Sequence, residues 1–477
     1  MKYILVLFIL LALSACGREN VLEKERVVRR LSVFTFESPE ILHSAAYNLQ
    51  THWDTARPNH LLDFRFHTME WYDRHNIVSH FKSMFAAGQS YDMILMWDMP
   101  VWELANSGYL TNIYTLMDAD PFTNRFAADT SRDDFFHQPL RALEINGGLY
   151  HMPVGFGLHY VSINTALPEH IIGRFANSST VTLHDMMILY LEIVRDPEFE
   201  HMHFSSGFPG GYSPLGAVAV YIGNYINFDA RTADLQNEKF LDFLAYTREI
   251  FNRPVRFGIP TGLPPLRTFQ NIISGRYHVF HVDTHFANPV MAFVDAQHRI
   301  EFVHKFYHGR PMADNRGRLL MDTWTNDLME FGLGFANMHT NFWDSVSFPV
   351  MGNSELAWEF IQFNMEFFNL RQFAPSNAIA SPIVRELFEP NVSAAFRGIG
   401  LAPVVTPFNI DIRECEYTLD AVLAGISALN EMPMAPVTSH IPAALFADDL
   451  DEFMDGAISE EALARRLQGI VMHWLAQ

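Results

Sequence analysis

The run 278–285 carries the most unusual set of chemistry-bearing side chains in the sequence, and it reads His-Val-Phe-His-Val-Asp-Thr-His. If this run is a β-strand, His281, Asp283 and His285 lie on one face, because side chains alternate along a strand. Two imidazoles and one carboxylate at this spacing are compatible with a metal ion. The same residues could instead contact a ligand directly or form a polar strand edge.

Motifs of the common hydrolases are absent from the sequence. There is no H-E-x-x-H, no G-x-S-x-G and no class A lactamase triplet. Acidic residues are abundant, but the distance between two carboxylates cannot be read from sequence, so a glycosidase pair stays open on this ground alone. The two cysteines, Cys16 and Cys415, are too few for a disulfide framework or a four-cysteine zinc site.

Composition indicates a folded protein that does not bind nucleic acid. Of 477 residues, 49% are apolar and 14% aromatic, which is more buriable surface than disordered chains carry. The 33 basic residues stand against 54 acidic residues, a formal charge of −21. Nucleic acid requires a basic footprint, so this balance argues against such a partner.

The N-terminal part of the chain alternates predicted strands with predicted helices. The strands are recognised by period-two alternation and the helices by apolar residues at three- to four-residue spacing. Asn76 suits a helix N-cap and Gly88 a C-terminal stop. This order is typical of an α/β domain with a mostly parallel sheet. The predicted strands are 31–36, 62–66 and 92–96, and the predicted helices are 39–53, 76–88 and 100–106.

The remaining chain predicts a second domain, because one hydrophobic core usually stops growing at about 250–300 residues. In the last helix, Ser459 is the expected N-cap, and Ile458 and Leu463 occupy the positions of a hydrophobic staple. The predicted strands are 160–164, 277–282 and 331–336, and the predicted helices are 184–194, 237–251, 354–368 and the helix that follows Ser459.

Several aromatic and polar residues follow predicted strands. Ligands of doubly wound sheets bind beyond the carboxyl ends of the strands, so these residues are candidate ligand contacts. Other roles are open: Trp97 could pack between sheet and helix, Asp98 could cap the next helix, and Trp324 could belong to a core. The candidates are Phe36, Glu37, Trp97, Asp98, Phe156, His159, Phe208, Tyr212, Asp283, His285 and Trp324.

The N-terminus has the features of a bacterial lipoprotein signal. One lysine precedes about ten apolar residues and the sequence Leu-Ser-Ala-Cys at 13–16. This resembles a lipobox, in which Cys16 becomes the lipidated first residue of the mature protein. We expect a signal peptide at 1–15 and a solvated, lipidated tether at 16–30, because residues 17–30 are polar and lack apolar periodicity.

From about Leu31 the chain resembles the family 1 extracellular solute-binding proteins, the sugar-capturing lipoproteins of ABC importers. Each matching segment is weak alone, but their order and spacing together are specific. The most specific is 142–153, Ala-Leu-Glu-Ile-Asn-Gly-Gly-Leu-Tyr-His-Met-Pro; the others are Tyr-Asp-Met-Ile-Leu-Met-Trp at 91–97, Glu-Leu-Ala-Trp-Glu-Phe-Ile at 355–361 and Phe-Met-Asp-Gly-Ala-Ile-Ser-Glu-Glu-Ala at 453–462.

The resemblance implies a type 2 periplasmic-binding-protein fold: two α/β lobes, each a mostly parallel sheet flanked by helices, hinged around a ligand cleft. It implies an N-terminal lobe of 31–152 plus about 306–350 and a C-terminal lobe of 153–305 plus about 351–477. It also makes the candidates above sugar contacts, with aromatic rings stacking on the sugar and polar side chains binding its hydroxyl groups.

The function implied is capture of a sugar or oligosaccharide by hinge closure and delivery to the transmembrane subunits of an ABC permease, with no enzymatic activity and no cofactor. The protein would be an extracytoplasmic monomer, held at the membrane by its N-terminal lipid only. Two alternatives remain: a peptide, polyamine or metal complex as ligand of the same fold, and, less favoured, an exported glycoside hydrolase.

Overall fold

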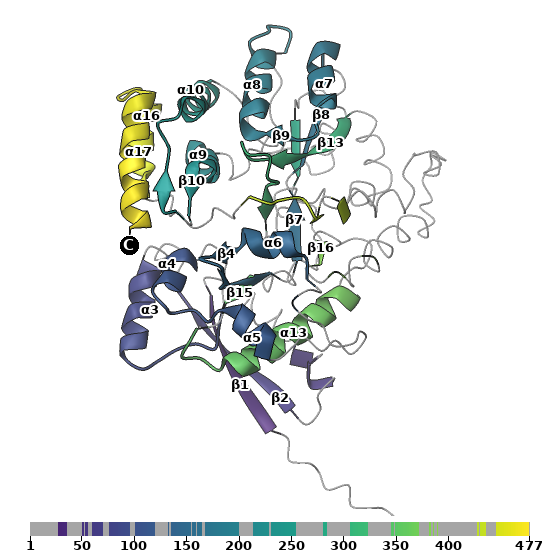
Figure 1. The fold of residues 1–477 in the computed structure, drawn as a ribbon, viewed down its shortest axis with the longest axis vertical. Coiled ribbons are helices and arrows are strands. Elements are labelled where there is room, and N and C mark those ends of the chain that lie inside the picture. The colour runs from purple at the N-terminus through teal and green to yellow at the C-terminus, as the bar shows by residue number, and fades with distance from the viewer. Residues whose placement is uncertain are drawn as a thin grey trace, which may run out of the picture.

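The fold is taken from a computed structural model of the chain. It describes residues 27–35, 50–51, 53–55, 60–69, 76–95, 101–119, 132, 135–153, 155–158, 160–164, 167–199, 213–228, 230–253, 280–283, 306–322, 345–347, 349–371, 381–382, 385, 389, 427–428, 430–435 and 445–476. These residues form two lobes, one above the other in Figure 1.

The first lobe contains a five-stranded sheet in the order β2-β1-β3-β15-β6. β1 pairs in parallel with β2 and β3, whereas β15 pairs antiparallel with both β3 and β6. All strands except β15 therefore share one direction. The strands are β1 (Val27–Thr35), β2 (His60–Thr68), β3 (Met93–Leu95), β6 (Met152–Pro153) and β15 (Ser345–Ser347).

The second lobe contains a four-stranded sheet in the order β12-β8-β13-β9. β8 pairs antiparallel with β12 and β13, and β13 pairs in parallel with β9, so β8 alone is reversed. Both sheets thus confirm the predicted mostly parallel arrangement. The strands are β8 (Tyr160–Asn164), β9 (Val181–Thr182), β12 (Phe280–Asp283) and β13 (Phe306–Ala313).

A third sheet, β14-β7-β16, links the lobes, and we call it the connecting sheet. β7 stands between β6 of the first lobe and β8 of the second, and β14 stands between β13 of the second and β15 of the first. β16 stands between helix α13 of the first lobe and the C-terminal helices of the second. The strands are β7 (Gly155–Leu158), β14 (Met321–Asp322) and β16 (Ser381–Pro382).

The helices of the first lobe follow the predicted periodicity. α3 starts after Asn76 and ends before Gly88, which has φ +71°, as predicted for a helix stop. The Asn76 side chain makes no capping hydrogen bond. The helices are α3 (Ile77–Ala86), α4 (Val101–Asn106), α5 (Ile113–Ala119), α6 (His137–Ala142) and α13 (Ser354–Arg371); the short hairpin strands are β4 (Glu144–Ile145) and β5 (Gly148–Leu149).

Side-chain caps fix the starts of several helices in the second lobe. Thr182 and Asp185 form a capping box at α8, and Ser459 accepts a hydrogen bond from the Ala462 amide at α17, as predicted. The helices are α7 (Glu169–Ala176), α8 (Leu183–Val194), α9 (Pro214–Ile222), α10 (Glu238–Asn252), α16 (Ala447–Met454) and α17 (Glu460–Leu475); β10 (Ile226–Asn227) and β11 (Thr232–Ala233) form a hairpin.

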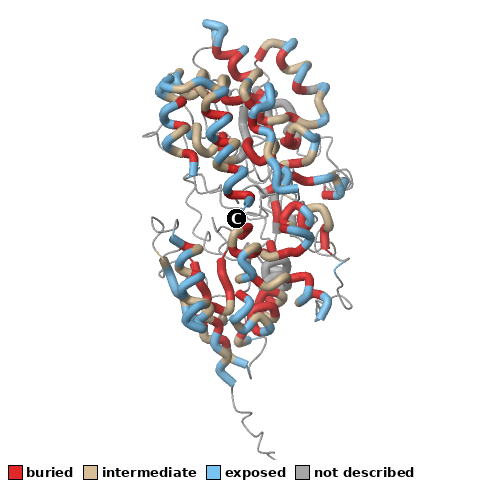
Figure 2. The backbone as a smooth tube through the Cα atoms, turned by 60° about the vertical axis from the view of Figure 1, so that its left-hand side comes forward, coloured by how far each residue is buried: buried red, intermediate tan, exposed pale blue. Residues whose placement is uncertain are grey.

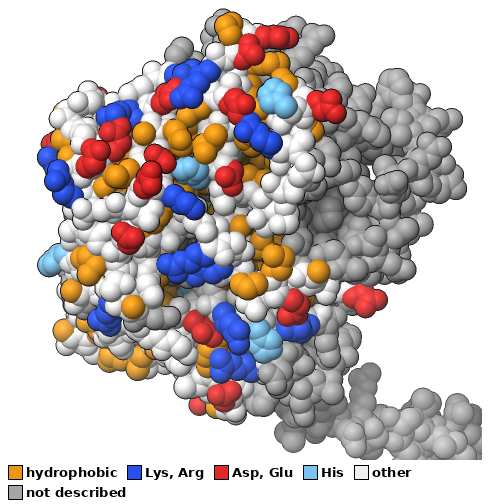
Figure 3. All heavy atoms as spheres, turned by 45° about the horizontal axis from the view of Figure 1, so that its top comes forward, with side chains coloured by type: hydrophobic (Ala, Val, Ile, Leu, Met, Phe, Trp, Pro, Cys, Tyr) orange, Lys and Arg blue, Asp and Glu red, His pale blue; other side chains and the backbone are white. Residues whose placement is uncertain are grey.

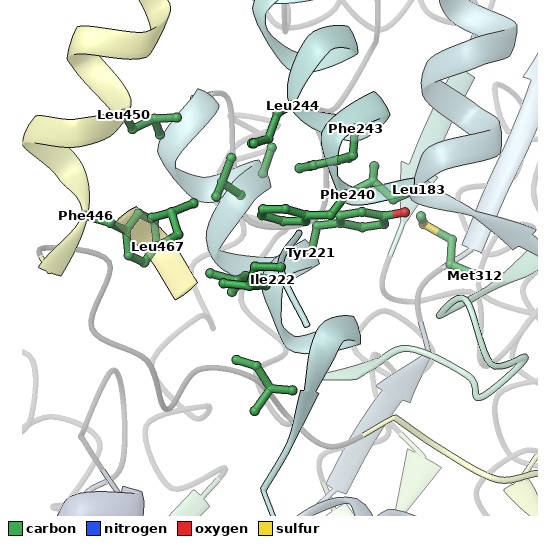
Figure 4. Close-up of a cluster of buried hydrophobic side chains, with 14 of the residues drawn as sticks. Leu183, Tyr221, Ile222, Phe240, Phe243, Leu244, Met312, Phe446, Leu450 and Leu467 are labelled. Atoms are coloured by element: carbon green, nitrogen blue, oxygen red, sulfur yellow. The ribbon is translucent and has the colours of Figure 1, made fainter. Parts of the chain in front are cut away.

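The core of the second lobe is a cluster of aromatic and aliphatic side chains between α8, α9, α10, α16 and α17 (Figure 4). The rings of Tyr221 and Phe243 stack at its centre, with centroids 3.8 Å apart. Leu450 and Leu467 pack into it from the two C-terminal helices. In Figure 2 buried residues run through both lobes, and the C-terminus lies between them.

The expected lobe boundaries are wrong in two places. Residues 306–313 were assigned to the first lobe, but β13 pairs with β8 and β9 of the second. Residues 351–371 were assigned to the second lobe, but α13 packs on the first: the Phe360 ring lies 5.2 Å from that of Phe64, and Glu359 pairs with Arg29 at 2.5 Å. These pairings join segments far apart in the chain, so local sequence pattern could not reveal them.

β1 begins at Val27, four residues before the predicted strand and inside the segment expected to be tether. Val27 and Val28 are half exposed, and the strand continues there because β2 pairs along its whole length. Residues 1–26, with the predicted signal and Cys16, lie outside the described residues, as do residues 39–49 of the predicted helix 39–53 and the predicted strand 331–336; residues 50, 51 and 53 are helical. Within the described part of the chain, no helix is both long and apolar enough to cross a membrane.

Acidic and basic side chains alternate on the face shown in Figure 3, with apolar side chains among them. Many arginines pair with carboxylates on neighbouring helices: Arg195 contacts Glu249 at 2.5 Å, and Arg466 contacts Asp449 at 2.6 Å. Exposed pairs of this kind contribute about 0–1 kcal/mol each, so they do not determine the fold.

Candidate ligand-binding site at the connecting sheet

The topology turns the carboxyl ends of the strands of both lobes toward the connecting sheet. β6 runs directly into β7, so its carboxyl end faces the second lobe, and β3 runs in the same direction as β6. In the second lobe β8 leaves β7, and β12 and β13 run opposite to it, so their carboxyl ends face the first lobe. Strand ends from two lobes that face each other in this way are where α/β proteins bind ligands.

Four candidates of the first lobe follow strands whose ends face the second. Phe36 and Glu37 come directly after β1, which ends at Thr35, and Trp97 with Asp98 follow β3, which ends at Leu95. The four residues themselves lie outside the described residues. Their place in the chain agrees with a role in the site, and their contact with a ligand stays a prediction.

Asp283 of the second lobe lies at the end of its strand, opposite the first residue of β8. Asp283 is the last residue of β12 and pairs with Tyr160, the first residue of β8. His159 directly precedes Tyr160 in the chain and lies outside the described residues, as does His285. The pairing therefore places Asp283 at the edge of the sheet that faces the first lobe, directly opposite Tyr160, the residue that follows His159 in the chain.

Phe156 lies in β7, the central strand of the connecting sheet, and is fully buried. Its ring packs edge-on against Phe136, with centroids 5.8 Å apart. Arg385 lies over the Phe136 ring and donates from Nε to the carbonyl oxygen of Phe135 at 2.9 Å. In this arrangement Phe156 supports the connecting sheet, and its contact with a ligand stays a prediction.

Asp322 is a site candidate that the sequence did not indicate. It lies in β14 and pairs with Gly157 of β7, whereas Asp283 pairs with Tyr160 of β8, so the two acidic residues flank the 155–160 segment from different strands. Trp324 follows two residues later and lies outside the described residues. A partner 165 positions away in sequence leaves no local signal.

The loop with Phe208 and Tyr212 also lies outside the described residues. It leads into α9, whose start is fixed by Ser213: the hydroxyl oxygen accepts from the Gly216 amide at 3.1 Å, and Pro214 occupies the first turn. The segment with Phe208 and Tyr212 therefore joins a helix whose start is fixed by a side-chain cap. Contact of these two residues with a ligand stays a prediction.

Titratable groups behind the first sheet are held neutral by burial. Burial raises the pKa of the Tyr91 hydroxyl and lowers the pKa of His80, and the two side chains are 3.1 Å apart. Both rings pack on Phe34 of β1. These groups hold β1 and β3 in place, and they carry no charge to act on a substrate at neutral pH.

Among the described residues, no group of three or more histidine, cysteine or acidic side chains is arranged to hold a metal ion. The metal alternative required His285, which lies outside that set. The metal-binding alternative therefore stays a prediction.

Comparison with solved structures finds proteins of the same architecture over nearly the whole chain. An ABC substrate-binding protein from Listeria monocytogenes in complex with cycloalternan matches with a TM-score of 0.52 and 12% identity, over 94% of this chain and 99% of that one. A solute-binding protein from Agrobacterium radiobacter in complex with ribitol matches with a TM-score of 0.53 and 12% identity, over 94% and 99%. One from Thermotoga lettingae bound to α-D-tagatose matches with 0.53 and 10% identity, over 94% and 100%.

The chain has the two-lobed fold of ABC-transporter solute-binding proteins. No protein-family model matches the sequence, and neither does any curated protein. In this fold the connecting sheet links the two lobes, and the facing strand ends are the candidate place for a ligand.

Proposed function

We propose that the protein is the substrate-binding component of an ABC importer and captures a sugar or oligosaccharide between its lobes. The observation that carries the proposal is the connecting sheet, across which the carboxyl ends of both sheets face each other. A ligand bound there contacts both lobes and stabilises the closed arrangement, which the permease subunits then recognise. The protein binds and releases its ligand without changing it.

The chemistry of the candidate residues favours a sugar. Asp283 and Asp322 flank the segment 155–160 from two different strands, and carboxylates accept pairs of hydrogen bonds from sugar hydroxyl groups. Trp97 follows β3 at the facing wall, and an indole ring can stack on the apolar face of a sugar. The solved proteins of this fold named above were bound to a cyclic oligosaccharide, a sugar alcohol and a ketose, which agrees with this ligand class.

We also propose that the protein acts outside the cytoplasm, tethered to the membrane by the predicted lipid on Cys16, and that it is a monomer. The described fold begins at Val27, so about ten residues separate the lipid from the first strand. Extraction of the expressed protein into detergent, and its release on Cys16→Ser, tests the anchor.

Thermal unfolding against a panel of mono- and oligosaccharides tests the function, with a form that starts at Arg18 and keeps every described residue. A ligand at 100 times its dissociation constant stabilises the folded state by about 2.7 kcal/mol. Asp283→Asn and Asp322→Asn should reduce that shift, whereas Asp63→Asn, on β2, should not. Product analysis after overnight incubation with the bound sugar checks for glycoside cleavage.

A shift with one group of sugars supports the proposal. A shift only with peptides, polyamines or a metal complex would keep the fold and replace the ligand class. Cleavage of a glycoside at a catalytic rate would refute the binding-protein assignment.

A further inference from the structure

The C-terminal helix of the second lobe contacts the first lobe through Trp474. The indole Nε1 of Trp474 donates a hydrogen bond to Oε1 of Glu103 at 2.8 Å, and its ring centroid lies 4.5 Å from that of Trp102. Trp102 and Glu103 belong to the first turn of α4, directly after the turn that follows β3. Both tryptophans are almost fully buried.

α17 itself is fixed to the second lobe. Gln468 accepts a hydrogen bond from the Leu235 amide at 2.7 Å and donates one to the Ala233 carbonyl at 2.6 Å. Near the start of the helix, Glu460 pairs with Arg248 of α10. The Trp474 contact therefore joins two rigid bodies that the chain otherwise links through the connecting sheet.

The hairpin β10–β11 of the second lobe adds a further contact with the same tryptophans. The Arg231 guanidinium lies 5.7 Å from the Trp102 ring centroid, and the Phe228 ring meets Trp474 edge-on at 6.4 Å. Arg231 has φ +50°, a left-handed conformation that favours glycine. In this conformation the hairpin places the arginine as a cation beside the indole of Trp102.

We propose that Trp102, Glu103, Trp474 and Arg231 form an inter-lobe latch that holds the lobes in the observed arrangement. Within the described part of the chain, β14 and β16 of the connecting sheet are only 2 residues long each, so these strands fix the lobes relative to each other through few backbone hydrogen bonds. A buried indole pair with a hydrogen bond to a carboxylate then contributes a large part of the free energy that holds the lobes in this arrangement. In Figure 1 α4 and the C-terminal end of α17, the two elements that the contact joins, lie to the left of β7 and β16. A contact at a distance from the connecting sheet has a large effect on the angle between the lobes.

The latch also positions the proposed site, and this part rests on the proposed function. α4 starts at Val101, three residues after Asp98 in the chain, so the position of α4 limits where the segment with Trp97 and Asp98 can lie. Trp474 and Glu103 thus act as positioning residues for ligand contacts that they do not touch.

The test measures the lobe arrangement without ligand. Spin labels at Lys82→Cys on α3 and Lys239→Cys on α10, in the full chain with Cys16→Ser and Cys415→Ser, report the distance between the lobes. Trp474→Ala should lengthen and broaden the distance distribution, and Trp474→Phe, which keeps a ring, should do so less. Met472→Ala is the matched control, because this side chain on α17 is 36% exposed.

Two milder variants keep the test decisive if Trp474→Ala does not fold. Arg231→Gly removes the cation and relieves the left-handed backbone, so it should broaden the distance distribution while the melting temperature stays the same or rises. Glu103→Gln keeps an acceptor but removes its charge, and it should have a smaller effect of the same sign.

Ligand affinity is the second readout. For the sugar found by thermal unfolding, Trp474→Ala should raise the dissociation constant about tenfold and Glu103→Gln about threefold, because only part of the free energy of the lost or weakened latch contacts is passed on to the ligand contacts. Wild-type distance distributions in both Arg231→Gly and Glu103→Gln would overturn the latch. If no sugar binds, the proposed ligand class is refuted, but the distance measurement still shows whether the latch holds the lobes together.

Discussion

Asp92 joins three separated segments of the first lobe, and its replacement should destabilise that lobe strongly. Its Oδ2 accepts hydrogen bonds from the amide and the hydroxyl of Ser32 in β1, both at 2.7 Å. Its Oδ1 accepts one from the amide of Asn353, also at 2.7 Å, at the start of α13. One carboxylate thus ties β1, β3 and the segment that returns from the second lobe.

The size of the effect follows from these three bonds. Hydrogen bonds to a charged group contribute about 1.5–3 kcal/mol each, which gives an upper limit of about 9 kcal/mol. Asp92 is only partly buried, so water replaces part of the lost bonding. We expect Asp92→Ala to lower the free energy of unfolding by about 3–4 kcal/mol and Asp92→Asn, which keeps one acceptor oxygen, by about 2 kcal/mol.

Gly352 offers an independent test of the same junction. A Cβ at this position would lie 2.1 Å from the carbonyl oxygen of Tyr91 and 2.8 Å from Cα of Asp92, so the backbone would have to separate. Gly352→Ala should therefore destabilise the lobe by at least about 2 kcal/mol without touching the carboxylate.

Urea unfolding followed by tryptophan fluorescence measures these changes, because Trp53 and Trp358 are buried in the first lobe. Asp63→Ala is the control: its carboxylate, on β2 of the same sheet, pairs with the exposed Arg65 at 2.9 Å. It should change the free energy by less than about 0.5 kcal/mol. An Asp92→Ala variant as stable as the control would refute the reasoning.

Three further predictions concern the second lobe and the connecting sheet. Burial lowers the pKa of His184 below its ordinary value of 6.5, so the stability that the neutral imidazole contributes is full above pH 6.5 and is lost as the pH falls through the lowered pKa. His184→Phe should therefore reduce the drop in melting temperature between pH 7.5 and pH 5.5. An unchanged drop would contradict this. Thr182→Ala removes the acceptor for the Asp185 amide, 3.0 Å away, and should cost about 1 kcal/mol in chemical denaturation, with no loss arguing against the cap. Arg385→Ala leaves the carbonyl of Phe135 without this donor and should lower stability by about 1–2 kcal/mol in the same assay; a neutral result would mean that the arginine does not brace the connecting sheet.

Local sequence patterns predicted the elements that depend on local interactions. The starts of α8, α10 and α17 came within about one residue of prediction, because apolar spacing and a nearby capping side chain decide them. The last helix shows this most clearly: Ser459 caps it as expected, and Leu463 is fully buried at the expected staple position.

Long-range pairing decided what could not be predicted. Nothing local in 306–313 indicates that its partner is β8, and nothing in 354–371 indicates that Phe360 packs on Trp53 and Phe64. The same limit applies to the site. The strand-end rule selected Asp283, which ends β12, and its contact with a ligand stays a prediction. The rule gave no means to select Asp322, which is a candidate only because its strand pairs with Gly157.

The placement of Asp283 and Asp322 also explains why binding and lobe movement should be coupled in this protein. Asp283 ends a strand of the second sheet, whereas Asp322 belongs to the connecting sheet itself, and both are registered on the single segment 155–160 that runs from one lobe to the other. A ligand held by both would fix the positions of the strands around segment 155–160. A small rotation at this segment produces a large displacement at the far ends of the lobes. The Trp102–Trp474 contact between α4 and α17 would limit the same rotation of one lobe against the other. If both act on one rotation, their effects are not additive: in Asp322→Asn, the further change in ligand affinity caused by Trp474→Phe should differ from its effect in wild type by about twofold or more, and strict additivity would show that the two features act independently.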